Sequence, residues 1–114
     1  MNKKILVLED DKDISLLLTD LLSAEGYEVR ISDSEEFLKW DDFNPNVILL
    51  DYWLNGVDGK ILYEKIRRHS NFKSSSTILL SAVNNILEIA SELGVDYIKK
   101  PFDIDELLKK IASI

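Results

Sequence analysis

Carboxylates follow two short apolar runs of the sequence, and they are the residues best suited to chemistry. Asp51 comes directly after the run Val47–Leu50, and the pair Glu9 and Asp10 comes directly after Ile5–Leu8. An apolar run without polar alternation is typical of a strand buried on both faces of a parallel sheet. The carboxyl ends of such strands form the edge at which open α/β sheets bind ligands. These acids are therefore candidates for one shared site, although Asp51 on its own could equally open a turn.

A hydroxyl and an amine follow two further candidate strands. Ser81 ends the run Thr77–Leu80, and Lys100 follows the strand predicted over 95–99. Taken alone, Ser81 could be an ordinary helix cap. If these strands belong to the same parallel sheet, four separate segments deliver acids, a hydroxyl and an amine to one crevice.

This set of groups fits the transfer of a phosphoryl group. Adjacent carboxylates repel one another, and a hard divalent cation such as Mg²⁺ relieves that repulsion while keeping several of its waters. A phosphoryl group could then approach Asp51, whose carboxylate could act as a nucleophile and form an aspartyl-phosphate. Lys100 could hold the phosphoryl oxygens, and Ser81 could donate a hydrogen bond to one of them.

Helical segments alternate with the strands along the whole chain. The pattern at 27–31 alternates and predicts a half-buried strand near the sheet edge. Apolar residues at helical spacing predict five helices, over 14–22, around 34–40, over 61–66, over 86–93 and from 104 to 111. Five strand–helix units predict a doubly wound parallel α/β sheet with helices on both faces and right-handed crossovers, in one domain over residues 1–114.

Polar residues at the helix ends predict how the helices begin and stop. Asp13 is a candidate cap of the first helix, Ser34 or Asp33 of the second, and Asp103 of the last. His69 is the only histidine, and its polar surroundings predict a solvent-exposed helix end rather than a place in a site.

Composition excludes several classes of function. The 114 residues carry a net charge of -7, which argues against nonspecific binding to nucleic acid or to an anionic membrane. The chain has no cysteine, so disulfides, thiolate metal sites and cysteine nucleophiles are excluded. No apolar run approaches the roughly 20 residues of a membrane span, and the four-residue apolar run near the start of the chain is too short for the core of a signal peptide. We expect a soluble, cytoplasmic domain.

The ordered set of motifs resembles the receiver domain of the response regulators of two-component signalling. Each motif alone is weak, but together they span essentially the whole chain. They are Ile5–Asp11, Leu49–Leu54 with Gly56 and Asp58-Gly59, Leu80–Ala82, and Tyr97–Phe102. The resemblance implies a flavodoxin-like fold with strand order 2-1-3-4-5. It also implies a domain that promotes its own phosphorylation by a histidine kinase or phosphotransfer protein, signals to an output domain or protein, and turns over no free metabolite.

The resemblance also implies roles for individual residues. Asp51 would be the phosphoacceptor and Lys100, rather than Lys99, the site lysine, because Lys100 directly precedes the proline of that motif. Ser81 would be the switch hydroxyl and Tyr97 the switch aromatic residue. The Mg²⁺ ligands would be Glu9, Asp10, Asp51 and the backbone carbonyl of Trp53, whereas Asp11 lies just past the acidic pair and is not expected to be a ligand.

The sequence departs from the family pattern near the site. Asn55 stands where the family usually has a proline, which predicts a less rigid loop. The segment from Ser81 to Lys100 is a few residues shorter than usual, and it belongs to the usual signalling face. In the family, side chains two positions after the phosphoacceptor and two after the switch hydroxyl flank the path by which water reaches the phosphate. Here they are Trp53 and Val83, which would shield the phosphate, so the resemblance implies slow dephosphorylation.

Three other functions compete with this interpretation. A phosphatase of the haloacid dehalogenase type needs a second acid two residues after the nucleophile, where this chain has Trp53. An FMN carrier of the flavodoxin type needs a hydroxyl- and glycine-rich loop after the first strand, where this chain is acidic. A degenerate receiver that binds partners without phosphorylation stays open because of the shortened segment.

Overall fold

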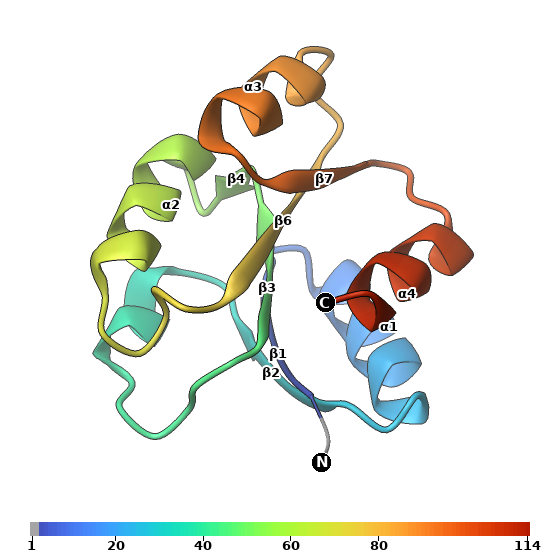
Figure 1. The fold of residues 1–114 in the computed structure, drawn as a ribbon. Coiled ribbons are helices and arrows are strands. Elements are labelled where there is room, and N and C mark those ends of the chain that lie inside the picture. The colour runs from blue at the N-terminus through green and yellow to red at the C-terminus, as the bar shows by residue number, and fades with distance from the viewer. Residues whose placement is uncertain (1–2) are drawn as a thin grey trace.

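A five-stranded parallel sheet forms the centre of the molecule (Figure 1). The computed structural model describes residues 3–114. The strands of this sheet are β1 (Lys4–Leu8), β2 (Glu28–Ser32), β3 (Val47–Asp51), β6 (Ser76–Ser81) and β7 (Asp96–Lys99). They pair in the order β2-β1-β3-β6-β7, which confirms the predicted order of the five main strands. In the β1–β3 register Leu8 lies opposite Leu50, so these two strands end side by side.

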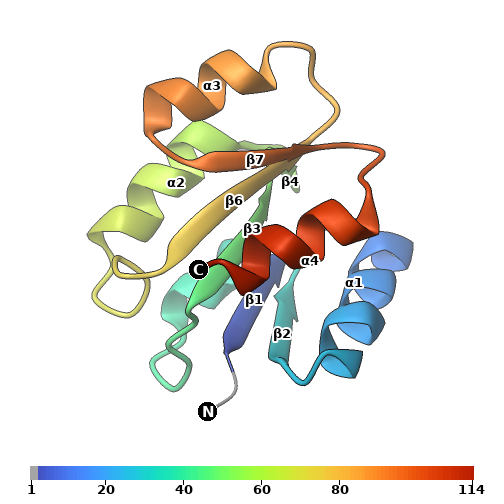
Figure 2. The same cartoon turned by 45° about the vertical axis from the view of Figure 1, so that its right-hand side comes forward.

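Helices cover both faces of the sheet, as a doubly wound fold requires (Figures 1 and 2). The helices are α1 (Lys12–Ala24), the 3₁₀ helix η1 (Glu35–Lys39), α2 (Gly59–Arg68), α3 (Ile86–Leu93) and α4 (Ile104–Ala112). The apolar stripes of α1 and α4 pack on one face, and those of α2 and α3 pack on the other.

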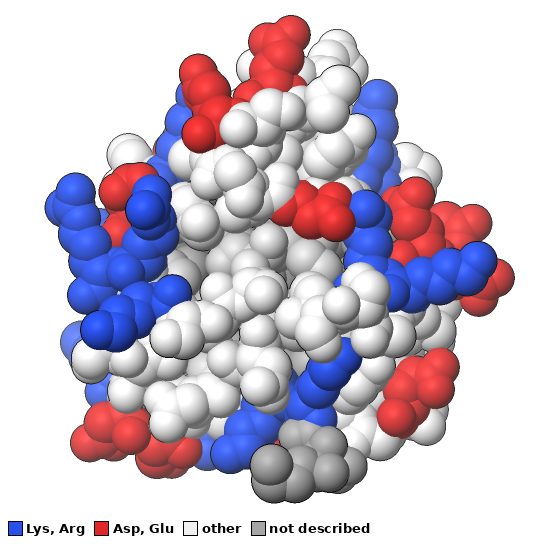
Figure 3. Space-filling model, in the orientation of Figure 1, with Lys and Arg blue, Asp and Glu red and all other residues white. Residues whose placement is uncertain are grey.

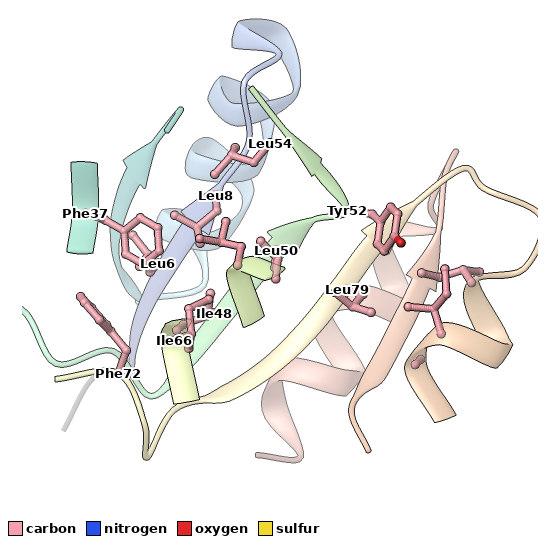
Figure 4. Close-up of a cluster of buried hydrophobic side chains, with 14 of the residues drawn as sticks. Leu6, Leu8, Phe37, Ile48, Leu50, Tyr52, Leu54, Ile66, Phe72 and Leu79 are labelled. Carbon is pink, nitrogen blue, oxygen red and sulfur yellow. The ribbon is translucent and has the colours of Figure 1, made fainter. Parts of the chain in front are cut away.

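The three inner strands, β1, β3 and β6, are buried on both faces, which explains their unbroken apolar runs. Successive side chains of a strand point to opposite faces. Ile5 and Val7 therefore join the cluster under α1 and α4, whereas Leu6 and Leu8 join the cluster under α2 and α3. Figure 4 shows the second cluster, in which Phe37 and Phe72 meet edge to face. Burial of each such side chain contributes about 2 kcal/mol to the free energy of unfolding.

The second predicted helix, expected around 34–40, forms as a 3₁₀ turn and not as an α-helix. The chain forms only the 3₁₀ turn η1 and leaves it at Trp40, whose backbone is extended. Trp40 and Phe43 instead cover the guanidinium of Arg30, which also forms an ion pair with Asp42 at 3.0 Å. These contacts use the residues that would have continued the helix.

The helix caps differ from the prediction in one case. Asp11, not Asp13, caps α1, because its carboxylate accepts the backbone N–H groups of Asp13 and Ile14. Ser34 caps η1 and Asp103 caps α4, as predicted.

His69 lies at the end of α2, but the expectation that it is exposed to solvent is wrong. Its ring is half-buried, lies 4.7 Å from the ring of Phe72, and pairs through Nε2 with the carbonyl of Leu38 at 2.7 Å. The ring thus ties α2 to the end of η1.

A β-hairpin occupies the place where the sequence predicted a loop. It consists of β4 (Trp53–Leu54) and β5 (Val57–Asp58), paired antiparallel. The two residues between the strands, Asn55 and Gly56, have φ angles of 49° and 80°. Two successive positive φ angles are typical of a type I′ turn, for which Asn-Gly is the preferred sequence. Asn55-Gly56 is therefore a local hairpin signal in the sequence, although only a loop was predicted there.

Charged side chains are unevenly spread over the surface. Figure 3 shows basic side chains gathered over α2, whose last turn carries Lys65, Arg67 and Arg68. Positive charge at a helix carboxyl end is favourable. Among residues 3–114, no helix is long and apolar enough to cross a membrane.

Candidate functional site

Three carboxylates converge where β1 and β3 end. Glu9, Asp10 and Asp51 each offer one carboxylate oxygen, and these oxygens lie within 4.8 Å of one another. Glu9 and Asp51 are buried, whereas Asp10 is exposed to solvent. The arrangement follows from the parallel pairing of the two strands, which brings their following residues to one edge.

Lys100 joins this cluster from the end of β7. Its Nζ lies 2.7 Å from Glu9 Oε1 and 3.3 Å from Asp51 Oδ1. The backbone N–H of Lys100 donates to the carbonyl of Ser81 at 2.8 Å, which continues the β6–β7 pairing by one residue and aims the side chain inward. Lys99 is exposed, so the structure places the lysine before the proline in the site, as predicted.

Burial and neighbouring charges shift the pKa values of Asp51 and Lys100. Burial, together with the neighbouring carboxylate of Glu9, raises the pKa of Asp51 to about 7, although Lys100 partly opposes that effect. Burial lowers the pKa of Lys100, but the hydrogen bond to Glu9 and the charge of Asp51 outweigh it, so the pKa of Lys100 is raised overall. The amine is therefore positively charged, and Asp51 changes its charge near neutral pH.

The hydroxyl of Ser81 lies at the same edge, at the end of β6. Its Oγ is buried and accepts the backbone N–H of Val83 at 3.0 Å. A hydroxyl that accepts one hydrogen bond can still donate its own proton. Ala82 between them is exposed and small.

Tyr97 lies on β7 and does not belong to the acid cluster. Its side chain is half-buried and packs against the core under α2 and α3. In the β6–β7 register it lies opposite Leu79, two residues before Ser81.

The hairpin after Asp51 borders the site and holds a contact that the sequence analysis did not foresee. The backbone N–H of Asn55 donates to Asp10 Oδ2 at 3.1 Å. Trp53 has 51% of its surface exposed, and its ring meets that of Tyr52 edge to face at 5.3 Å. The ring of Tyr52 also packs against Gly59, where a side chain would not fit, because a Cβ at position 59 would lie 2.9 Å from Tyr52 Cδ1.

The acid cluster suits a hard cation by its chemistry. All its ligand atoms are carboxylate oxygens, and the exposed Asp10 leaves an open side on which an ion could keep water ligands. The carboxylate of Asp11 is engaged at the start of α1, where it accepts the backbone N–H groups of Asp13 and Ile14.

Comparison with known proteins identifies the family. Residues 5–112 match the family model of the response regulator receiver domain. The chain belongs to this family. As a receiver domain it is a signalling domain rather than a classical enzyme.

Curated relatives of this receiver domain are transcriptional regulators. The chain is 34% identical over 116 residues to the transcriptional regulatory protein KdpE of Staphylococcus aureus, covering 100% of this chain and 50% of the relative. It is 31% identical over 119 residues to the phosphate regulon regulatory protein PhoB of Rhizobium meliloti, covering 100% and 52%. The receiver domain thus spans about half the length of these relatives.

Solved structures of receiver domains superpose on nearly the whole chain. The signal receiver domain of a response regulator from Bermanella marisrubri has a TM-score of 0.85 at 26% identity, with 99% of this chain and 98% of that chain covered. The receiver domain of the sensor histidine kinase PA1611 from Pseudomonas aeruginosa has a TM-score of 0.78 at 25% identity, covering 96% and 93%. The latter holds a magnesium ion in its active-site cleft.

Proposed function

We propose that this receiver domain accepts a phosphoryl group on Asp51 in a Mg²⁺-dependent reaction. The observation that carries the proposal is the convergence of the three carboxylates with Lys100, whose amine lies 2.7 Å from Glu9 and 3.3 Å from Asp51. The phosphodonor is a phosphorylated histidine of a sensor kinase or of a phosphotransfer protein. The magnesium ion in the PA1611 receiver supports the same cation here.

In the proposed reaction, an Asp51 carboxylate oxygen attacks the phosphorus of the phosphohistidine. The new O–P bond forms as the N–P bond breaks, and the electron pair returns to the imidazole nitrogen, which takes a proton from water. Asp51 must be ionised to attack, and its pKa of about 7 leaves a large ionised fraction at neutral pH.

Glu9, Asp10, Asp51 and the carbonyl of Trp53 would hold Mg²⁺, which supplies positive charge to offset that of the carboxylates and the incoming phosphoryl group. Lys100 already carries its charge beside Asp51 and can turn toward a phosphoryl oxygen. Positioning and charge stabilisation are the main needs of phosphoryl transfer.

The proposed response to phosphorylation is a shift between two states. Ser81 donates its hydroxyl proton to a phosphoryl oxygen, and Tyr97 turns further into the core beside β6, because burial of its ring adds apolar contact. The ring signals of Tyr97 in NMR spectra should therefore move when Mg²⁺ and beryllium fluoride are added together. Unchanged Tyr97 signals in a protein that binds beryllium fluoride would count against this switch.

The proposed output is transcriptional. The relatives KdpE and PhoB are transcriptional regulators about twice as long as the matched region, so we expect the switch to control a DNA-binding unit of the same protein. The net charge of -7 makes direct binding of DNA by the receiver itself unfavourable.

The test of the proposed function is phosphorylation by a small phosphodonor. Acetyl phosphate with Mg²⁺ should add one phosphoryl group to the wild-type protein, measured by intact mass. Chelation of Mg²⁺ should prevent the reaction, and so should Asp51→Asn. An Asp51→Asn protein that gains the same mass would overturn the assignment.

A further inference from the structure

The three carboxylates of the site accept hydrogen bonds from different donors, and the backbone N–H of Asp10 donates to Glu9 Oε2 at 3.1 Å. The amine of Lys100 contacts both buried acids, Glu9 and Asp51. Asp10 is exposed, and the N–H of Asn55 donates to its Oδ2 at 3.1 Å. An exposed carboxylate without a donor samples several rotamers, and ordering it costs free energy when a ligand binds.

The hairpin turn aims this N–H. Asn55 has a φ of 49°, a left-handed conformation that asparagine tolerates better than most residues. Gly56 follows with a φ of 80°, and the turn is closed by the pairing of Leu54 with Val57. Leu54 is fully buried in the same core cluster as Leu8 and Leu50, which anchors the hairpin to the strands that carry the acids (Figure 4).

We infer that Asn55 is a positioning residue that acts through its backbone, orienting Asp10 for the cation. A carboxylate has two oxygens with about four lone-pair sites, so one N–H bond to Oδ2 leaves ample capacity for a metal ion. A proline at position 55 could not do this, because it has no N–H and its φ is fixed near -65°. The hairpin therefore gives this chain a donor that a proline at the same place removes. The inference rests on the proposed Mg²⁺ site.

The test compares the Mg²⁺ affinity of three variants by calorimetry. Asn55→Pro removes both the N–H and the left-handed turn, and we expect about fivefold weaker binding, the effect of losing one charge-assisted hydrogen bond at an exposed site. Asn55→Gly keeps both features and should bind within about twofold of wild type. Asn55→Ala keeps the N–H but disfavours the turn, and should fall between the two. Equal or tighter binding by Asn55→Pro would overturn the inference.

A second measurement does not depend on the fold of the proline variant. In the metal-free wild-type protein, the Asn55 amide proton should resonate downfield in NMR spectra and exchange slowly with solvent. Asp10→Ala should move it upfield and speed its exchange. An Asn55 amide proton whose chemical shift and exchange rate are the same in Asp10→Ala as in the wild type would refute the contact.

The failure of this inference can be told apart from a failure of the proposed function. Phosphorylation of the wild-type protein by acetyl phosphate in saturating Mg²⁺ tests the proposed function without any change at position 55. If the wild-type protein is not phosphorylated, the proposed function is wrong, while the order of Mg²⁺ affinities among the variants still decides the role of Asn55.

Discussion

Replacing Asp51 with asparagine is expected to make the metal-free protein more stable at alkaline pH. Asp51 is buried beside the carboxylate of Glu9, and these surroundings raise its pKa from 3.8 to about 7. A carboxyl group with a raised pKa in the folded state binds more protons when folded than when unfolded. The free energy of unfolding therefore falls as the pH rises from about 4 to about 7, and an asparagine removes this loss.

The size of the effect follows from the same pKa. The difference between a pKa of 3.8 and a pKa of about 7 corresponds to a loss of at most about 4 kcal/mol in the free energy of unfolding at pH above 7. The Asp51 side chain keeps 12% of its surface exposed, and solvent screening at that surface reduces the gain. We expect Asp51→Asn to raise the free energy of unfolding by about 2 kcal/mol at about pH 8, with the gain shrinking toward zero near pH 4.

Urea denaturation at about pH 5 and about pH 8, with a chelator present, measures this gain. Asp20→Asn is the matched control, because Asp20 is an exposed carboxylate on α1 and its replacement should change stability little at either pH. A gain for Asp51→Asn that is the same at both pH values, or a loss at pH 8, would refute the account of the site's electrostatics.

Three further predictions concern the same groups. Mg²⁺ binding should weaken by about tenfold for each pH unit below 7, because Asp51 must release its proton; pH-independent calorimetric affinities would contradict this. Lys100→Ala leaves two buried acids unpaired and should lower the free energy of unfolding at pH 8 by about 2 kcal/mol, against less than about 0.5 kcal/mol for Lys99→Ala; equal losses would argue against the ion pairs. Trp53→Asn and Val83→Glu should each speed decay of the phosphorylated protein on the order of tenfold, since a polar side chain can position water; unchanged decay rates would dismiss the shielding idea.

The location of the site could be predicted from the sequence because it depends on topology. Unbroken apolar runs identify buried parallel strands, and parallel strands end at one edge. Residues at the carboxyl ends of β1, β3 and β7 were therefore expected to meet, and Glu9, Asp51 and Lys100 do meet. The choice of Lys100 over Lys99 came instead from the resemblance to the receiver family, in which the site lysine directly precedes the proline.

The details that could not be predicted depend on tertiary contacts. The second helix forms only a 3₁₀ turn because Trp40 and Phe43 cover Arg30, a pairing between distant residues that no local pattern encodes. His69 is half-buried because Phe72 and the Leu38 carbonyl happen to lie beside it. The hairpin is different, since Asn55-Gly56 is a local turn signal, but its contact with Asp10 depends on how the hairpin packs on the core.

The position of the phosphoryl group tests the central claim most directly. The protein is phosphorylated with acetyl phosphate and Mg²⁺, reduced with borohydride, which converts an acyl phosphate into an alcohol, and then digested and sequenced by mass spectrometry. We predict that the reduced residue is Asp51 alone, with Glu9 and Asp10 unmodified. Reduction at another carboxylate, or a stable phosphoryl group on a hydroxyl such as that of Ser81, would contradict the account.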